Sequence, residues 1–387
     1  MTIRLALVAG ARPNFMKVAP LIRALRRTSG FRWRLIHTGQ HYDREMSGVF
    51  FDELGIPQPN VSLECGGGTQ AEQTAKTMVA LERDLTAHPV DCVVVVGDVN
   101  STVAAALAAK KLQLRLAHVE AGLRSGDRTM PEEINRLVTD SISDLFLVTE
   151  PSGIQALLRE GHDPTSIRHV GNLMIDNLFH QLERLQAADP AQYQTTALKA
   201  GLERTGYGVV TLHRASNVDD RATLTGLIGA LNEISRQLPL VFPVHPRTHA
   251  RMQSFGLAAA DAVRLTSPLS YMEFLNLWKD ARVVLTDSGG LQEETTALGV
   301  KCVTMRTTTE RPITLTEGSN VLAGTEPAAV VAAARAALGS PASVRRPALW
   351  DGHSAERIVA ELRDFLQPPR TPAARPRPAV TVVQAAR

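Results

Sequence analysis

Short apolar runs of strand length alternate with longer amphipathic segments along almost the whole chain, and this alternation constrains the fold more than any other feature. Repeated β–α order of this kind is typical of parallel, doubly wound sheets covered by helices. The first half of the chain contains six such repeats. We expect strands at 3–9, 32–37, 92–97, 115–119, 145–148 and 167–170, and helices at 14–28, 42–54, 70–86, 101–111, 132–142 and 151–160.

A second series of the same kind follows a polar, helical connector at 171–206. The pattern predicts an α/β protein with two Rossmann-like domains that face each other across a cleft. We expect an N-terminal domain at 1–171, joined by a last helix at about 353–366, a C-terminal domain at 172–352, and a disordered tail at 367–387. The second series predicts strands at 207–212, 239–244, 262–265, 282–286, 301–304 and 320–322, and helices at 220–236, 271–278, 290–298 and 326–338.

The composition narrows the class of protein. The chain has 387 residues, 44% hydrophobic and 21% charged, which is ordinary for a soluble globular protein with more than one domain. Its apolar runs are far shorter than the roughly 18 residues that a membrane span needs. The net charge is +3, but the tail holds four arginines and no acid, so the charge does not indicate a nucleic-acid partner. Three widely spaced cysteines predict neither disulfides nor a metal site, and they favour a cytoplasmic location.

The stretch from Val93 to Arg136 brings three acids to one edge of the predicted sheet. Asp98 and Glu120 each close a short apolar run, and Glu132 follows in the segment Pro-Glu-Glu. The carboxyl ends of parallel strands lie along one edge, where α/β proteins place their chemistry. These residues are therefore candidate catalytic acids.

Ordinary structural roles compete with that interpretation. Asn100 or Ser101 could cap the helix that follows Asp98, and Pro131 with two acids in the first turn is good helix-start chemistry. A glutamate beside a buried strand end needs a partner, and either His118 or Arg124 could pair with Glu120.

The first β–α turn reads GARPNFMK and supplies two cations, Arg12 and Lys17. It lacks the G-x-G-x-x-G pattern of dinucleotide folds, so no nicotinamide cofactor is indicated. Cations near a helix start suit an anionic ligand, because free backbone N–H groups point the same way. The next strand ends in HTGQHYD, which places Gln40 and His41 at the same edge.

The second half contributes a complementary set of residues. The segment LTDSGGLQEE ends a strand at Asp287 and opens a helix at Ser288, Gly289 and Gly290, whose N–H groups can hold a diphosphate. Three further side chains lie nearby in the predicted layout. Glu294 is placed to accept hydrogen bonds from ribose hydroxyls, Arg311 follows in TTTERP, and His213 heads a loop in TLHRASN.

Taken in order, these motifs resemble those of the non-hydrolysing UDP-N-acetylglucosamine 2-epimerases, which have the glycosyltransferase-B architecture. The resemblance runs from the first strand to about Leu366. It is carried by GARPNFMKVAPL, TGQHYDREM, GDVNST, HVEAGLRSGD, MPEEINR, VGNLMIDNL, LHRASN, TDSGGLQEE and TTERP.

The resemblance implies an isomerase that interconverts UDP-GlcNAc and UDP-ManNAc. UDP leaves by anti elimination, giving 2-acetamidoglucal, and then adds back, with no cofactor and no metal. The implied product supplies ManNAc-type sugars for cell-surface polysaccharide, and the family is usually dimeric. By motif, the catalytic residues are Asp98, Glu120, Glu132 and His213. The implied UDP-sugar contacts are Arg12, Lys17, Ser288, Gly289, Gly290, Glu294 and Arg311, and the implied contacts of an activating UDP-GlcNAc are Gln40, His41 and Gln70.

The chain departs from the family pattern at two places. Many members have Arg-Pro-Glu where this chain has Asn14, and His-Arg-Arg-Glu where it has Ala215 and Ser216. If these positions touch the sugar or the activator, the substrate could be a modified one such as UDP-2,3-diacetamido-glucuronic acid. Three further functions stay open, namely a hydrolysing epimerase that releases ManNAc, a glycosyltransferase of the same architecture and a catalytically silent UDP-sugar sensor.

Overall fold

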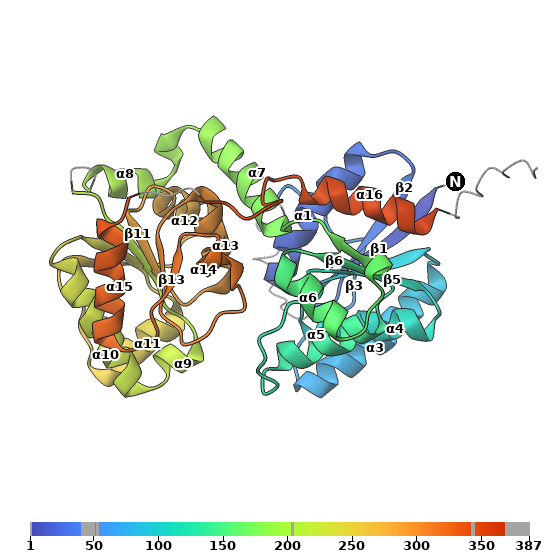
Figure 1. Ribbon diagram of the computed structural model, residues 1–387, viewed down its shortest axis with the longest axis horizontal. Helices are drawn as coiled ribbons and strands as arrows, with labels where there is room; N and C mark the ends of the chain where they lie inside the picture. The colour runs from blue at the N-terminus through green and yellow to red at the C-terminus, as the bar shows by residue number, and fades with distance from the viewer. Residues whose placement is uncertain (1, 40–50, 52–53, 203–204, 342–344, 368–387) are drawn as a thin grey trace, which may run out of the picture.

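Two parallel α/β units, one from each half of the chain, lie side by side in the computed structural model (Figure 1). The structure describes residues 2–39, 51, 54–202, 205–341 and 345–367, and the side chain of Arg12 lies outside this set. Each unit is a parallel sheet with helices on both faces, so the predicted α/β class with two Rossmann-like units is confirmed. None of the helices in these ranges is both long and apolar enough to span a bilayer.

The first sheet has seven strands within the described ranges, in the order β3-β2-β1-β4-β5-β6-β7, and every neighbouring pair is parallel. The strand order reverses between β1 and β4, so the loops after these two strands flank a crevice at the carboxyl edge. The strands are β1 (Ile3–Ala9), β2 (Phe31–His37), β3 (Val61–Ser62), β4 (Cys92–Val96), β5 (Arg115–Val119), β6 (Leu145–Val148) and β7 (Ile167–His169).

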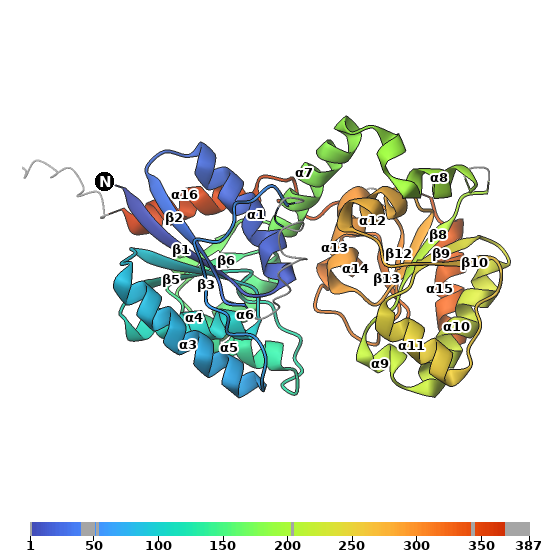
Figure 2. The same cartoon turned by 180° about the vertical axis from the view of Figure 1, so that it is seen from behind.

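Helices cover both faces of this sheet (Figure 2). Helix α1 (Arg12–Arg27) packs on one face, and α3 (Gln70–Ala87) and α4 (Asn100–Lys111) pack on the other. Alternate residues of β1 enter the two cores. All five residues of β4 are buried, as expected for a central strand with helices on both sides. The helices are α1 (Arg12–Arg27), α3 (Gln70–Ala87), α4 (Asn100–Lys111), α5 (Pro131–Ile142) and α6 (Pro151–Arg159).

The second sheet repeats the design with six strands among the described residues, in the order β10-β9-β8-β11-β12-β13. Its order reverses between β8 and β11, so the loops after these strands flank a second crevice. The strands are β8 (Gly208–Thr211), β9 (Leu240–Pro243), β10 (Val263–Thr266), β11 (Val283–Thr286), β12 (Cys302–Thr304) and β13 (Asn320–Leu322). The helices are α8 (Gln194–Ala200), α9 (Ala215–Val218), α10 (Arg221–Ser235), α11 (Pro246–Phe255), α12 (Tyr271–Trp278), α13 (Gly289–Leu298), α14 (Ile313–Thr316) and α15 (Pro327–Gly339).

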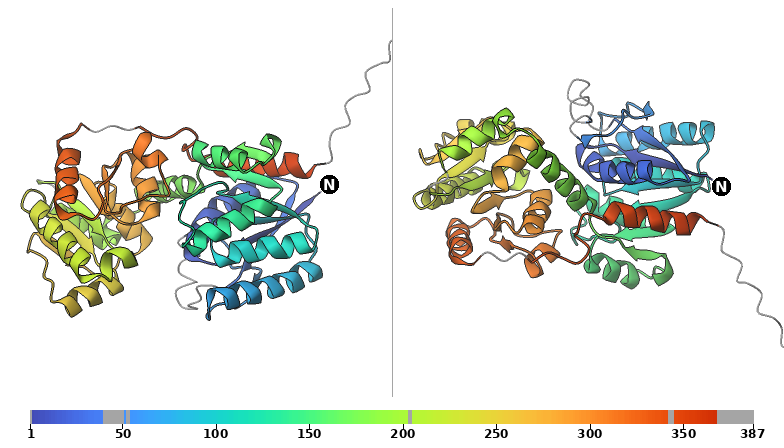
Figure 3. Two further views of the ribbon diagram at one scale, coloured as in Figure 1. Left: turned by 60° about the horizontal axis from the view of Figure 1, so that its bottom comes forward. Right: turned by 90° about the horizontal axis from the view of Figure 1, so that it is seen from above.

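Two segments link the units, and they meet at the start of the last helix. Helix α7 (Leu173–Ala187) leads out of the first unit, and the chain returns to it through α16 (Ser354–Leu366) (Figure 3). The buried carboxylate of Asp176 on α7 accepts hydrogen bonds from the N–H groups of Ser354, at 3.1 Å, and Ala355, at 2.7 Å. Helix α16 thus packs into the core of the first sheet, while the domain boundaries themselves remain a prediction.

A few elements differ from the sequence expectation. Strand β3 has two residues, too few for any periodicity to show. Helix α11, which starts directly after His245 with a proline in its first turn, was not among the expected helices. The helix expected at 42–54 falls mostly on residues outside the described set. The three cysteines are buried and free.

Candidate active site

A cavity of about 330 Å³ lies between the two units, at the carboxyl edges of both sheets. Both halves contribute charged groups to its wall, which fits the prediction that a cleft separates two complementary sets of residues. The lining residues are Pro13, Lys17, Asp98, Met130, Glu132, Arg136, Met174, His213, Arg214, Ser288, Gly289, Gly290, Glu293, Glu310 and Arg311.

A second pocket, of about 390 Å³, opens at the opposite edge of the first sheet beside Trp33. It lies at the amino ends of the strands, away from the loops that carry the acids. Two of its arginines, Arg4 and Arg34, are already paired with Asp91 and Asp84. The slightly smaller cavity between the units is therefore the better candidate site.

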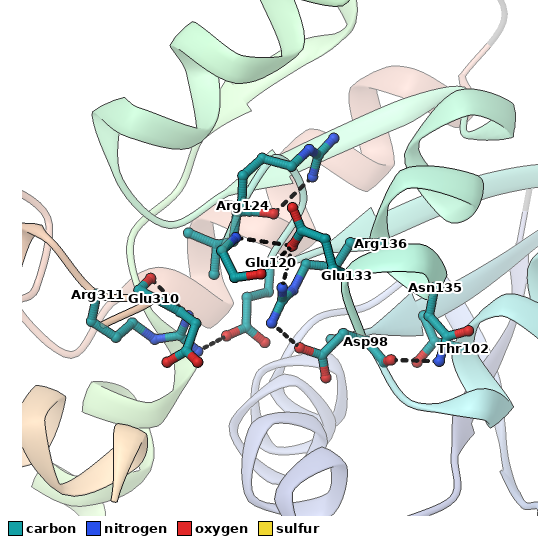
Figure 4. Close-up of polar contacts among 12 residues, drawn as sticks. Asp98, Thr102, Glu120, Arg124, Glu133, Asn135, Arg136, Glu310 and Arg311 are labelled. Atoms are coloured by element: carbon teal, nitrogen blue, oxygen red, sulfur yellow. Dashed lines mark hydrogen bonds and ion pairs between the residues drawn. The ribbon is translucent and has the colours of Figure 1, made fainter. Parts of the chain in front are cut away.

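Glu120 occupies the centre of the charged network beside this cavity (Figure 4). It directly follows β5 and has a left-handed backbone, with φ of 71°, which is costly for a residue other than glycine. Its carboxylate pairs with the ammonium of Lys17 from the first unit and, at 2.6 Å, with the guanidinium of Arg311 from the second. Burial alone would raise the pKa of Glu120, but these two cations outweigh it and lower the pKa to about 2.

The expected partners of Glu120 were wrong. His118 is fully buried and contacts Asp140 at 2.7 Å through Nδ1 and the carbonyl of Gly97 at 2.9 Å through Nε2. Arg124 also pairs with Asp140, at 2.7 Å. Residues two apart in a strand face the same side, but the left-handed turn at Glu120 rotates its side chain away from His118 and toward α1.

Arg311 joins the two units through a pair of buried glutamates. Its guanidinium contacts Glu120 from one side, and its Nε lies 2.7 Å from Glu293 without being aimed at that carboxylate as a hydrogen bond. Glu293 also accepts a hydrogen bond of 2.8 Å from the amide of Asn172. Burial raises the pKa of Glu293, although Arg311 opposes this effect.

Asp98 lies two residues beyond β4 and reaches the cavity, as expected. Its carboxylate accepts a hydrogen bond of 2.6 Å from Arg136 of α5, and its backbone carbonyl accepts one from Asn135 at 2.9 Å (Figure 4). The expected caps are wrong here, since α4 is capped by Val99 without a side-chain hydrogen bond. Asn100 instead donates its amide to Gln70 and Gln73 of α3.

The two adjacent glutamates at the start of α5 have different surroundings. Glu132 is exposed to the cavity and makes no hydrogen bond or ion pair with the residues that the structure describes. Glu133 is 2% exposed and accepts hydrogen bonds from the N–H groups of Ser125 and Gly126 and from Arg136. Pro131 begins the helix, as expected.

The second unit faces these acids with the start of α13. Ser288 precedes the helix without capping it through its side chain, and Gly289 and Gly290 form its first turn. A Cβ added to either glycine would meet nothing nearer than 3.8 Å, so the space over this turn is open. First-turn N–H groups beside such a space form a site suited to a phosphate.

His213 lies next to this helix start and is oriented by a buried aspartate. Asp287 accepts hydrogen bonds from the backbone N–H groups of His213, at 3.0 Å, and Arg214, at 2.9 Å. Its carboxylate also lies 3.0 Å from Nδ1 of His213. Burial raises the pKa of Asp287, but the His213 side chain and these N–H groups outweigh it and lower the pKa.

Most of the residues singled out from the sequence gather around the cavity. Glu294 does not, since it is buried and accepts a hydrogen bond of 2.8 Å from the hydroxyl of Tyr271. Asn14 is also 2% exposed and binds the carbonyl of Val96, so it does not line the cavity as we considered for the sugar. Gln70 contacts Asn100. The side chain of Arg12 and the whole of Gln40 and His41 lie outside the described residues.

The predicted site residues did not include five charged residues of the site, namely Arg136, Glu133, Arg214, Glu293 and Glu310. Helical spacing was an available signal for the first pair, because residues three apart share a helix face. Glu310 accepts two hydrogen bonds from Arg306, at 2.7 and 3.0 Å, which shape the loop before Arg311. Loop contacts of this kind leave no periodic signal in a sequence.

Comparison with known proteins gives concordant matches. A family model described as UDP-N-acetylglucosamine 2-epimerase matches residues 23–363. The UDP-N-acetylglucosamine 2-epimerase of Methanocaldococcus jannaschii is 39% identical over 363 residues, which cover 92% of this chain and 98% of that protein. The UDP-2,3-diacetamido-2,3-dideoxy-D-glucuronate 2-epimerase of Pseudomonas aeruginosa is 37% identical, with 93% of this chain and 99% of that protein covered.

Solved structures agree with these matches. The M. jannaschii enzyme in complex with UDP-GlcNAc and UDP has a TM-score of 0.82 at 39% identity and covers 94% of this chain and 100% of that one. The Neisseria meningitidis UDP-GlcNAc 2-epimerase bound to UDP-GlcNAc has a TM-score of 0.85 at 26% identity, with the same coverage. Both superpose on the two units together.

Proposed function

This chain belongs to the UDP-N-acetylglucosamine 2-epimerase family of isomerases, and we propose that it interconverts UDP-GlcNAc and UDP-ManNAc without hydrolysing them. The observation that carries the proposal is the cavity between the two units. On one wall it has the acids Asp98 and Glu132 with Glu120 behind them, and on the other the glycine-rich start of α13.

The chemistry requires both walls. The hydrogen at C2 of the sugar is not acidic, because no carbonyl adjoins it, so it leaves together with the bond between C1 and the diphosphate oxygen. The start of α13 and His213 are suited to the charge that develops on the departing diphosphate. UDP then adds back to the 2-acetamidoglucal intermediate while C2 takes a proton on its other face.

Inversion needs proton transfer on two faces of the sugar, and the three acids have different surroundings. Glu120 is held as a carboxylate by Lys17 and Arg311, so in the resting enzyme it can accept a proton but has none to donate. Glu132 is exposed in the cavity and unpaired among the described residues, so its carboxylate is open to a bound sugar. Arg136 holds one side of the Asp98 carboxylate, and the other side faces the cavity.

A modified substrate is the second candidate. The P. aeruginosa relative acts, by its name, on a UDP-sugar that bears a carboxylate and a second acetamido group. In the cavity of this chain, the guanidinium of Arg214 forms no ion pair with the residues that the structure describes, so a cation is available for an extra negative charge. The same elimination and re-addition would apply to that sugar.

Several further points are part of the proposal and rest on the resemblance to the family. They are a homodimer, activation by a second UDP-GlcNAc, a cytoplasmic location and a role in supplying ManNAc-type sugars for polysaccharide.

The test is incubation in D₂O with UDP-GlcNAc and, in parallel, with its 3-acetamido uronic acid derivative, followed by NMR. We expect deuterium at C2 and the matching manno-configured UDP-sugar from one of the two. Free ManNAc with UDP as the first-formed products would identify a hydrolysing enzyme. An unlabelled C2 with both substrates would refute the proposed epimerisation.

A further inference from the structure

One buried glutamate beside the cavity has no place in the chemistry described so far. Glu133 lies next to Glu132 in the sequence, but at 2% exposed it cannot reach a substrate. It lies instead behind Arg136, whose Nη1 donates to Glu133 at 2.7 Å and whose Nη2 donates to Asp98 at 2.6 Å (Figure 4). A single guanidinium thus joins an inaccessible carboxylate to a cavity-lining one.

These contacts are rigid enough for the position of one group to fix the position of the next. The guanidinium is a planar group with fixed donor directions, so holding one nitrogen also fixes where the other points. Glu133 is itself fixed by the N–H groups of Ser125 and Gly126, at 2.9 and 3.1 Å. Burial would raise the pKa of Glu133, yet these N–H groups, Ser125 Oγ and Arg136 lower it, so it stays charged opposite Arg136.

We propose that Glu133 is a positioning residue that sets the orientation of the Asp98 carboxylate through the guanidinium of Arg136. The inference rests on the proposed function and extends it, because it assigns a role to a residue outside the contact range of the sugar. A reacting group displaced by about 1 Å can cost on the order of 10²-fold in rate. The effect should therefore appear in kcat while substrate binding is kept.

The experiment uses the full-length protein and the substrate that shows C2 deuteration in wild type. The variants are Glu133→Gln, Arg136→Lys and the double variant. A lysine can contact one of the two carboxylates but cannot bridge them in a fixed plane, so Arg136→Lys breaks the link and leaves Glu133 on its loop. We expect a loss of kcat of roughly 10- to 100-fold in each single variant, with KM and the Kd for UDP within about threefold of wild type.

The double variant decides the matter. If Glu133 acts through Arg136, the double variant is no worse than the more impaired single variant, because the link is already broken. Losses that multiply would overturn the proposal, as would a change confined to KM, which would make Arg136 a substrate-binding residue instead. If wild type itself labels neither substrate, the proposed function fails before any variant is compared.

Two controls separate positioning from general damage to the fold. Ser125→Ala removes a hydroxyl that donates to Glu133 at 3.0 Å but leaves the Arg136 link intact, so kcat should stay within about threefold. Glu233→Gln breaks an exposed ion pair with Arg335, at 2.8 Å, and should change nothing measurable. If Ser125→Ala reproduced the full loss of Glu133→Gln, loop support rather than the Asp98 link would be the role of Glu133.

Discussion

Two glutamates, one in each unit, are almost equally buried, and yet their pKa values shift in opposite directions. Glu120 is 7% exposed and Glu294 is 5% exposed. The cations Lys17 and Arg311 lower the pKa of Glu120 to about 2 against the effect of burial. Burial raises the pKa of Glu294 to about 7, since its partner is the neutral hydroxyl of Tyr271 and the nearby Glu293 adds to the rise. Burial acts to raise both pKa values, and the charge of the partners decides the direction of the net shift.

The contrast has consequences for stability that run in opposite directions. Glu120 has a lower pKa in the folded than in the unfolded protein, so it stabilises the fold above about pH 4.5, and this contribution is lost as the pH falls toward 2. Glu294 has a higher pKa in the folded protein, which therefore binds the extra proton between about pH 4.5 and 7. Its contribution is lost as the pH rises through that range.

The largest effect is expected from neutralising the ionised member of the pair. In Glu120→Gln the carboxylate that two cations hold is replaced by an amide that cannot accept a proton. We expect kcat to fall by about 10³-fold, within the range for loss of a general acid–base group. The Kd for UDP, measured by calorimetry, should stay within about tenfold, because the start of α13 is intact. Near-normal turnover would show that the charge at Glu120 serves the structure alone.

The next effect is on stability and concerns Glu294, the glutamate with the raised pKa. In Glu294→Gln the side chain keeps its size but cannot ionise. Between pH 5 and pH 8, wild type should lose up to about 3 kcal/mol of unfolding free energy relative to this variant. Urea unfolding of the ligand-free protein at both pH values measures the difference. Glu150 shifts in the same direction, with a pKa raised to about 7 by burial, but it is present in both proteins and cancels. Identical pH dependences would show that Glu294 is ionised in the fold.

The sequence placed Glu120 directly after its strand, as the structure has it, but it did not predict the contrast between the two glutamates. The apolar runs and the acids that follow them marked the carboxyl edges of both sheets, because a strand buried on both faces gives a short continuous apolar run that can be read directly. The reversal points in strand order then brought Lys17, Asp98 and Ser288 to one cavity. The confirmed fold and family therefore followed from local patterns and their order along the chain.

The pairing of side chains could not be read in the same way. Glu120 meets Arg311, which is 191 residues away, and it does so because a left-handed residue ends its strand. No spacing rule encodes such a contact. The sequence instead offered nearby partners, His118 and Arg124, which bind Asp140. Glu294 was assigned to the ribose from its motif, and its contact with Tyr271 likewise depends on how two helices pack.

A smaller effect follows from removing one of the two cations. In Lys17→Met, Glu120 keeps Arg311 but loses its other counter-charge, so its pKa should rise from about 2 toward the ordinary value. We expect kcat/KM to fall about tenfold at pH 8, where a cation near the substrate is lost, and further at pH 5, where part of Glu120 becomes protonated. A pH–rate profile measures this additional fall in kcat/KM at low pH.

The matched control for that profile is Lys279→Met. Lys279 pairs with Asp280 at 2.7 Å on the surface, and Asp280 keeps Lys199 as a second partner, so the variant repeats the loss of one of two cations away from the cavity. Its profile should coincide with that of wild type. A Lys17→Met profile with the wild-type shape would mean that Arg311 alone sets the ionisation of Glu120.

The smallest effect tests the neutral partner of Glu294. Tyr271→Phe keeps the ring but removes the hydroxyl that donates to the carboxyl at 2.8 Å. We expect a loss of about 1 kcal/mol in unfolding free energy, larger at pH 8 than at pH 5, because a hydrogen bond to an ionised carboxylate is stronger than one to its protonated form. Tyr207→Phe is the control, since the Tyr207 hydroxyl donates to the carbonyl of Leu277 at 2.6 Å, an acceptor that does not titrate. The loss of unfolding free energy in Tyr207→Phe should be the same at both pH values. If the loss in Tyr271→Phe were also independent of pH, Glu294 would not change its protonation over this range.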